Sequence, residues 1–341
     1  NTSSGQNSTI SGGLQNIATS TFSAISGGNR NSATGLLASI SGGQDNLSTG
    51  MGSSIGGGIN NKSVSTLTTV GGGTANDANA QYSTVAGGNN NDAFGDFSTI
   101  GGGINNLVGS TAKQSIIAGG LSNRINSMNS TISGGTANDI SVNSRLSFVG
   151  GGDTNVITHT SSSSSINSVI SGGNKNTVLN SSYAAIDGGR QNTITTSSHY
   201  SSIGGGQSST ITNSDYASIS GGTLNTIHSS RFAFIGSGNT NTIGTNSTAS
   251  VIGGGEINDI GTGATQSVIA GGYDNDIANN GIRSTIVGGY SNGITGNYST
   301  IAGGNDNAIN GLTNVVGGGE INSITGSHGT VGGGRNNRIT N

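Results

Sequence analysis

Single apolar residues recur along this chain at a fixed distance from pairs of glycines. Ile or Val stands two residues before the Gly-Gly in each of 21 blocks, from Ile10 to Val331. The blocks are 15 residues long up to Gly103 and 15–17 residues long afterwards, apart from one of 21 residues that ends at Gly173. A fixed period of this size is typical of architectures in which each repeat packs mainly on its two neighbours.

Three further columns accompany the Ile/Val. A small residue, most often Ser, stands two positions before it, and Asn stands three positions after the second Gly in 20 of 21 blocks, with Ser209 as the exception. Two positions after the Asn comes a second apolar column, which holds mostly Ala or Ser at first and Ile or Val from Val108 onward. The blocks therefore share two apolar columns, a Ser column and an Asn column.

These columns predict two short strands per block. Ser-x-Ile alternates with period two, so both side chains point to one face of a strand, and Asn-x-Ile predicts a second strand. The Gly-Gly between them allows a turn with positive φ. A stacked Asn is expected to hydrogen-bond to the coils above and below. We predict an all-β fold, a parallel β-solenoid or β-roll of about 21 coils of 15–17 residues, continuous over residues 1–341, with its longest inter-strand loop around residues 153–170.

An incomplete aromatic and aliphatic column stands three residues before the Ile/Val. It favours a hydrophobic corner stack that shields the strand entry, and the alternative is a ladder that contacts sugar or protein. Its members are Phe22, Leu37, Leu67, Tyr82, Phe97, Leu146, Tyr183, Tyr200, Tyr216, Phe232 and Tyr298.

The residue after the Ile/Val is almost always Gly, Ser or Ala, with Asp187 and Val287 as the main exceptions. A flat face of small residues permits close approach of another sheet, and coils with so little apolar mass have a thin core. We therefore expect a homo-oligomer of chains packed side by side.

Composition narrows the classes of partner. The 341 residues include 65 Gly, no Pro and no Cys, and the net charge is −3. Such a charge gives no reason to expect nucleic acid, and no apolar run of 18 residues predicts insertion into a membrane. The first residues lack a basic-plus-apolar signal, so any secretion signal is expected to lie outside this chain.

Two segments, Ser83–Gly88 and Ser98–Gly103, resemble the head repeats of trimeric autotransporter adhesins, the YadA-like heads. Those repeats likewise combine a Ser-rich strand carrying Val or Ile with a Gly turn and a small-residue second strand. The resemblance covers essentially the whole chain and implies a left-handed parallel β-roll, three chains around one axis and display on a bacterial surface. The double glycine, the Asn column and the period of 15–17 residues depart from that pattern. The repeats of this chain also resemble those of phage or virus fibres.

Candidate chemistry is sparse. The four histidines, His159, His199, His228 and His328, fall in different blocks and columns, and without Cys they form no metal-ligand spacing. Wherever Gly-x-Ser-x-Gly spacing occurs in the chain, no column of His residues accompanies it. We therefore expect no enzyme, and no catalytic, cofactor-binding or metal-binding residues.

Stacking still brings carboxylates together. Asp77 with Asp92, and Asp259 with Asp276, occupy equivalent positions one block apart. Solvated turn residues are the favoured interpretation, while a bound cation or a glycosidase pair are the alternatives, which the sequence does not decide. An ice-binding plane would need an unbroken Thr column, but the run that includes Thr84 is interrupted from Ile116 onward.

The sequence thus favours a non-catalytic, extracellular adhesin or fibre module on a cell or virion surface, with a host-surface, matrix or glycan ligand. The alternative is a structural subunit of an extracellular filament or virion fibre. A tailspike-like glycan hydrolase and an ice-binding solenoid are less favoured.

Overall fold

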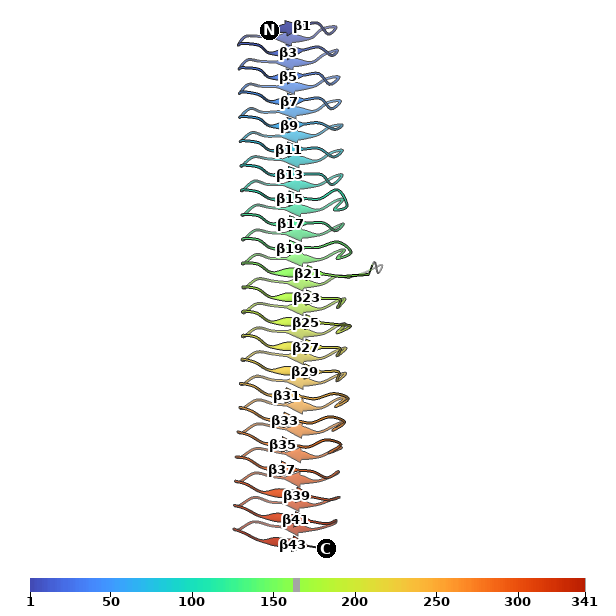
Figure 1. The fold of residues 1–341 in the computed structure, drawn as a ribbon, viewed down its shortest axis with the longest axis vertical. Helices are drawn as coiled ribbons and strands as arrows, with labels where there is room; N and C mark the ends of the chain where they lie inside the picture. Colours follow the sequence, from blue (N-terminus) through green and yellow to red (C-terminus); the bar gives the residue numbers. More distant parts are fainter. Residues whose placement is uncertain (162–165, 341) are drawn as a thin grey trace. The chain divides into compact units, whose positions relative to one another are not determined.

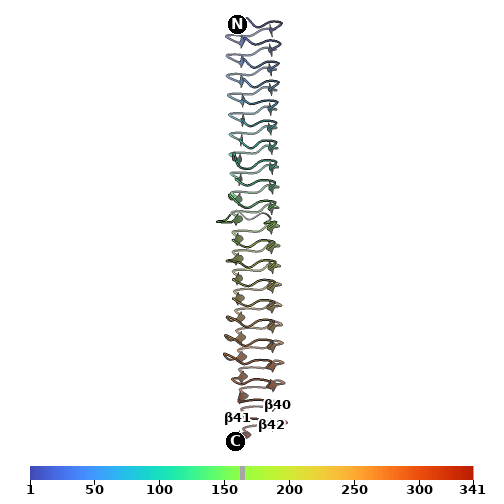
Figure 2. The same cartoon turned by 90° about the vertical axis from the view of Figure 1, so that its right-hand side faces the viewer.

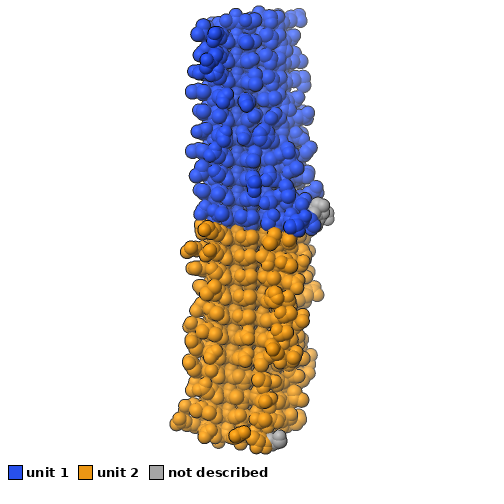
Figure 3. Space-filling view, viewed as in Figure 1, with its two compact units in different colours: residues 1–172 blue, residues 173–341 orange. Residues whose placement is uncertain are grey.

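The computed structural model describes residues 1–161 and 166–340. The chain divides into two compact units, Asn1–Gly172 (unit 1) and Gly173–Asn341 (unit 2), which are coloured separately in Figure 3. Every regular element of the described residues is a β-strand of two or three residues. Within each unit, the strands of successive coils lie side by side in two parallel sheets (Figures 1 and 2). The predicted all-β solenoid with two short strands per coil is confirmed.

Sheet A is formed by the strands that follow the Asn column. In unit 1 these are β1 (Thr2–Ser3), β3 (Ile17–Ala18), β5 (Ser32–Ala33), β7 (Leu47–Ser48), β9 (Lys62–Ser63), β11 (Asp77–Ala78), β13 (Asp92–Ala93), β15 (Leu107–Val108), β17 (Arg124–Ile125), β19 (Asp139–Ile140) and β21 (Val156–Thr158). In unit 2 they are β23 (Thr177–Leu179), β25 (Thr193–Thr195), β27 (Thr210–Thr212), β29 (Thr226–His228), β31 (Thr242–Ile243), β33 (Asp259–Ile260), β35 (Asp276–Ile277), β37 (Gly293–Ile294), β39 (Ala308–Asn310), β41 (Ser323–Thr325) and β43 (Arg338–Thr340).

Sheet B is formed by the strands that carry the Ile/Val column. In unit 1 these are β2 (Thr9–Ile10), β4 (Ala24–Ile25), β6 (Ser39–Ile40), β8 (Ser54–Ile55), β10 (Thr69–Val70), β12 (Thr84–Val85), β14 (Thr99–Ile100), β16 (Ile116–Ile117), β18 (Thr131–Ile132), β20 (Phe148–Val149) and β22 (Val169–Ile170). In unit 2 they are β24 (Ala185–Ile186), β26 (Ser202–Ile203), β28 (Ser218–Ile219), β30 (Phe234–Ile235), β32 (Val251–Ile252), β34 (Val268–Ile269), β36 (Thr285–Ile286), β38 (Thr300–Ile301), β40 (Val315–Val316) and β42 (Thr330–Val331).

Within each unit, the strands pair in register with the equivalent strands of the next coil, so that a sequence column becomes a column in space. In sheet B, for example, Val85 lies beside Ile100. The residue directly after the Gly-Gly forms a third ladder of single parallel bridges, such as that between Thr74 and Asn89. Repeating sequence columns are thereby converted into continuous stacks of like side chains.

The core of each unit is narrow and partly polar. Within one coil, the side chains of Ala78 and Val85 are buried, and so are those of Ser83 and Asn76. From Ile25 to Ile170 the Ile/Val column of unit 1 is at most 1% exposed. The apolar columns are therefore covered within a single chain, and the predicted association of several copies is not needed to bury them.

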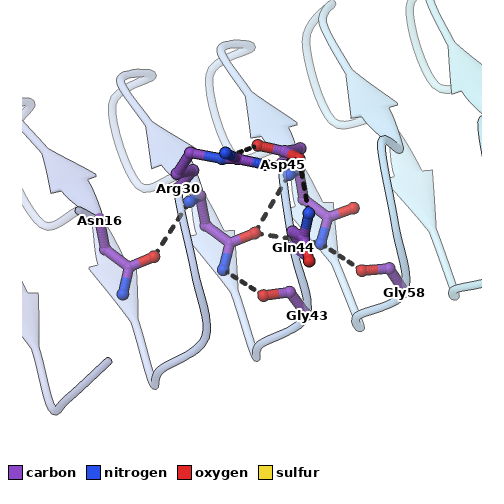
Figure 4. A network of polar contacts seen from close by, with 8 residues as sticks. Asn16, Arg30, Gly43, Gln44, Asp45 and Gly58 are labelled. Atoms are coloured by element: carbon purple, nitrogen blue, oxygen red, sulfur yellow. Dashed lines mark hydrogen bonds and ion pairs between the residues drawn. The ribbon is translucent and has the colours of Figure 1, made fainter. Parts of the chain in front are cut away.

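The Asn column satisfies the backbone at the glycine turn, and Figure 4 shows part of this network between Asn16 and Gly58. The Nδ2 group of Asn46 donates to the carbonyl oxygens of Gly42 (3.0 Å) and Gly58 (2.8 Å) and to Oδ1 of Asn31 (3.1 Å). The Oδ1 atom of Asn46 in turn accepts the backbone N–H of Asn61 at 2.9 Å. The predicted contacts to the coils on both sides are confirmed, and they satisfy buried groups that would otherwise lack partners.

The two glycines of each pair have different roles. The second adopts a positive φ, +93° at Gly88, and a Cβ added there would collide with the Gly103 carbonyl oxygen and approach Nδ2 of Asn91 at 2.6 Å. The first, Gly87, has no heavy atom within 4 Å of the Cβ position. Only the second glycine is therefore fixed by conformation and space together.

Two columns of non-glycine residues also adopt the left-handed conformation, which the sequence did not predict. They are the residue before the Asn, such as Ala75 (φ +54°), and the aromatic column, such as Tyr82 (φ +59°). Their N–H groups point to the preceding coil, since Tyr82 donates to the Thr66 carbonyl at 3.0 Å, whereas the strand residue Thr84 donates to the following coil. Backbone hydrogen bonds to both the preceding and the following coil offset the cost of the left-handed conformation, which is about 1 kcal/mol or more for each such residue.

All variation in coil length falls at one corner. The step from sheet B to sheet A through the Gly-Gly, here called the glycine corner, always takes seven residues, as from Val85 to Asp92. The step from sheet A to sheet B, the variable corner, takes six residues from Ala78 to Thr84 and more in longer coils. The longest lies between β21 and β22, inside the predicted 153–170 segment, of which residues 162–165 are outside the described part.

Loss of one Asn amide should destabilise unit 1. Asn46→Ala removes a donor from two turn carbonyls and an acceptor from the Asn61 N–H, so we expect a loss of about 3 kcal/mol in unfolding free energy, measured by denaturant unfolding. Asn46→Ser should cost less, because Ser209 occupies this column and its Oγ accepts the Asn225 N–H at 3.3 Å. Asn79→Ala, at an exposed strand end, is the control and should be nearly neutral. Equal effects of the two alanine variants would contradict the proposed role of the ladder.

The glycine pair offers a second test of the turn. Gly88→Ala combines a strained φ with a backbone collision and should lower the unfolding free energy by more than about 2 kcal/mol. Gly87→Ala, one residue earlier, places its methyl group in open space and should change it by less than about 0.5 kcal/mol. Thermal unfolding of the two variants under the same conditions measures this difference.

Candidate functional site

The aromatic column forms an exposed stack at the variable corner. In unit 2, Tyr183, Tyr200, Tyr216 and Phe232 follow one another with ring centroids 4.7, 4.9 and 5.1 Å apart. Their residues are 38–51% exposed. The Arg231 guanidinium lies 4.6 Å from the Phe232 ring centroid and 5.2 Å from that of Tyr216. A shorter stack in unit 1 pairs Tyr82 with Phe97 at 4.7 Å.

The geometry of this stack decides how it can contact a ligand. Because the rings lie nearly parallel at about the coil spacing, the two inner rings, Tyr200 and Tyr216, cover each other's faces. What remains open to solvent is the line of ring edges and phenol groups. The predicted corner stack is thus found at the entry to the sheet B strands, and its residues also keep 38–51% of their surface open to solvent.

A further pair of stacked rings, which the sequence does not predict, lies outside the aromatic column. Tyr273 and Tyr290 lie at the glycine corner with centroids 5.1 Å apart. Each directly follows a Gly-Gly, a position that otherwise holds Asn, Thr, Glu and other unrelated residues. The equal spacing from the glycines was the available signal, but two members do not establish a column.

The Asp77–Asp92 pair is brought together on the outer face of sheet A. The two residues are register partners on β11 and β13 and line a depression of about 270 Å³ together with Lys62 and Asn90. The Oδ1 atom of Asp77 is buried and accepts no hydrogen bond. Burial raises the pKa of Asp77, Lys62 opposes this, and Asp92 adds to it.

The Asp259–Asp276 pair lies on the same face of unit 2, where the two residues are partners on β33 and β35. Burial, and then the neighbouring charge of Asp276, raise the pKa of Asp259 to about 6. Burial and then Asp274 raise the pKa of Asp276. Stacking has therefore placed like charges together, as the sequence predicted, but the four carboxylates lie on strands of sheet A, so their interpretation as solvated turn residues was wrong.

Residues 1–161 and 166–340 contain no group of three or more His, Asp or Glu side chains arranged to hold a metal ion. The histidines do not converge. His199, for example, accepts the Ser182 N–H through Nδ1 at 3.0 Å, and its backbone N–H donates to Oδ1 of Asp215 at 2.9 Å. His228 ends β29 on sheet A in another column.

A depression of about 370 Å³ lies at the variable corner of unit 1, where two of the contributing coils are lengthened. Its lining includes Lys113, Met128, Val142 and Arg145 from three successive coils. Lys113 also forms an ion pair with Asp96 at 2.8 Å. The sequence does not predict this depression, because its lining comes from three successive coils, two of which break the column pattern.

The pH dependence of stability in unit 2 should carry the signature of Asp259. An unfolded aspartate titrates near pH 4, so a folded pKa of about 6 means that the folded state binds the proton more tightly. This contribution is fully present below about pH 4 and is lost as the pH rises through about 6. Allowing for solvent screening of a partly exposed group, we expect about 1 to 2 kcal/mol.

Asp259→Asn should therefore stabilise the protein at pH 7 and flatten the unfolding free energy between about pH 4 and pH 6. Asp306→Asn, which removes an exposed carboxylate at the glycine corner of the same unit, is the matched control. Urea unfolding across this pH range measures both variants. A wild-type protein that becomes less stable as the pH falls from 6 to 4, with no change in Asp259→Asn, would contradict the assignment.

In the part of the chain that the structure describes, no helix has the length and apolar character needed to cross a bilayer. Compared with known proteins, the sequence matches no family model and no curated protein.

Proposed function

We propose that this chain is a non-catalytic surface module that displays binding residues on a stiff stack of coils, as an adhesin or fibre head does. The observation that carries the proposal is the division between inner and outer columns. The buried side chains of the inner columns repeat from coil to coil and pack on or hydrogen-bond to one another. The outer residues at the variable corner, in contrast, change in kind and number. Such a division suits a scaffold that presents different side chains at fixed spacing.

The aromatic stack of unit 2 is the contact surface that this proposal favours. Tyrosine and arginine contribute strongly to protein interfaces, and here they form one line with Arg231 at its end. Since the faces of the inner rings are covered, sugar rings have little aromatic face on which to stack. Ring edges and phenol groups suit a protein surface better, so we propose a host-surface or matrix protein as the ligand in preference to a glycan.

The resemblance to YadA-like heads supports the remaining parts of the proposal. It supports display outside the cell, on a bacterial surface, in an assembly of three chains, and the related fibre repeats support a virion surface as the alternative. The stacked Asp77 and Asp92 line a depression with Lys62 and without a histidine, and we propose no catalytic role for them. A glycan hydrolase accordingly remains an alternative that the experiment below tests directly.

Labelled protein applied to arrays of immobilised matrix proteins, host-surface proteins and polysaccharides should bind saturably to a protein and cleave no polysaccharide. Replacing Tyr200 and Tyr216 with Ala should weaken that binding by about tenfold or more. Replacing the stacked pair Tyr273 and Tyr290 with Ala is the matched control, because the same groups are lost at the opposite corner. Cleavage of a polysaccharide would establish the hydrolase instead, and failure to bind any ligand would favour a purely structural subunit.

A further inference from the structure

The outer face of sheet B in unit 1 is devoid of charge. It consists of two columns, the first residue of each sheet B strand and the residue that follows the strand. The first column contains Thr9, Ala24, Ser39, Ser54, Thr69, Thr84, Thr99, Ile116, Thr131, Phe148 and Val169. The second contains Ser11, Ser26, Ser41, Gly56, Gly71, Ala86, Gly101, Ala118, Ser133, Gly150 and Ser171. All 22 residues lie in described positions, and not one is charged.

The opposite face of the same unit differs. Five of the eleven first residues of the sheet A strands are charged, namely Lys62, Asp77, Asp92, Arg124 and Asp139. Covering sheet A would remove these groups from water at a cost of several kcal/mol for each charge left without a partner. Covering sheet B carries no such cost. Charge therefore distinguishes two faces that have the same backbone geometry.

Exposed apolar residues border and interrupt the uncharged face. Ile116 and Phe148 on it are 45% and 38% exposed. The adjoining aromatic column adds Phe22, Leu37, Leu67, Tyr82, Phe97 and Leu146, each 45–55% exposed. A continuous surface that combines small residues, hydroxyl groups and exposed apolar side chains is typical of interaction sites rather than of free protein surface.

The area of this face matches that of a stable interface. From the aromatic column to the residue after the strand it is five residues wide, or roughly 16 Å at about 3.3 Å per residue. The eleven strands of sheet B in unit 1 extend over roughly 53 Å at about 4.8 Å per strand. The product, roughly 850 Å², is close to the ~800 Å² that each partner contributes to a standard interface.

We propose that a second copy of this chain covers the sheet B face of unit 1, so that copies pack side by side, sheet against sheet. A second copy is the partner that shares the coil spacing, so a contact formed at one coil recurs at each of the following coils. Neutral small residues allow the two sheets to approach closely, and facing Thr and Ser hydroxyl groups can hydrogen-bond across the interface. The inference rests on the part of the proposed function in which several chains assemble, and it names the surface that joins them.

The test places charges on one face or the other of the full chain. The sheet B variant carries Ala24→Lys, Ser39→Lys and Thr84→Lys, and the control carries Thr19→Lys, Thr34→Lys and Asn79→Lys at the sheet A face of the same three coils. The solution mass is measured by light scattering from micromolar to millimolar protein. Wild type and control should have at least twice the mass of one chain, while association of the sheet B variant should be weaker by about a hundredfold or more.

A second sheet B variant, Ser11→Lys, Ser26→Lys and Ser41→Lys, uses the neighbouring column, and far-UV circular dichroism shows whether each variant keeps its β-structure. Folded sheet B variants with the mass of the wild type would overturn the assignment of this face but leave assembly itself intact. A wild-type protein that stays monomeric throughout would overturn both. Ligand binding by the Tyr200 and Tyr216 variant tests the proposed adhesive contact, and the solution mass of the sheet B variants tests the proposed assembly face. The two proposals can therefore fail separately.

Discussion

The hydrogen-bonded column of buried asparagines is the interaction on which the remainder of the fold depends. A coil of 15–17 residues with strands of two or three residues has little apolar surface to bury, yet it must satisfy every turn carbonyl and amide that it removes from water. One Asn per coil satisfies a carbonyl of its own turn, a carbonyl of the next turn and an amide of the next coil. Because these contacts run along the stack, they fix adjacent coils in register as well as closing each turn.

Fixed register has consequences for every other column, since like residues must then lie on like residues. For aromatic rings this is favourable, and Tyr183 stacks on Tyr200 almost parallel. For carboxylates it is unfavourable, and the pKa of Asp259 rises. Opposite charges in one column form ion pairs instead, as between Arg124 and Asp139 at 2.8 Å. These exposed pairs contribute little to stability, but they show that a column can neutralise itself along the stack.

Most of the fold could be predicted from the sequence because its determinants are local and repeated. The Ile/Val, Asn and Gly columns each specify one feature of the backbone, and the structure places all three as expected. The left-handed residues could not be predicted, because Tyr82 and Ala75 belong to residue types without a preference for positive φ. That conformation is imposed by an amide that must point to the preceding coil. The depression around Lys113 and Arg145 was equally hidden, since it depends on how lengthened corners pack in space.

The contrast between the two corners explains where specificity can reside in such a protein. The glycine corner is bound by the Asn side chain, the positive φ of the second glycine and the carbonyl of the next coil, so an inserted residue would break several contacts at once. At the variable corner the buried Ser column forms a similar ladder, in which Ser250 accepts the Ser267 N–H at 3.1 Å and donates to the Ala264 carbonyl at 2.7 Å. The number of residues between the strands nevertheless varies at this corner, while the strands on both sides stay paired. Ligand contacts can thus differ from coil to coil at that corner without altering the core. The sheet faces can change in the kind of residue but not in the number of residues per coil, because their residues are held at strand spacing. A face without charge therefore suits a partner of the same regular spacing.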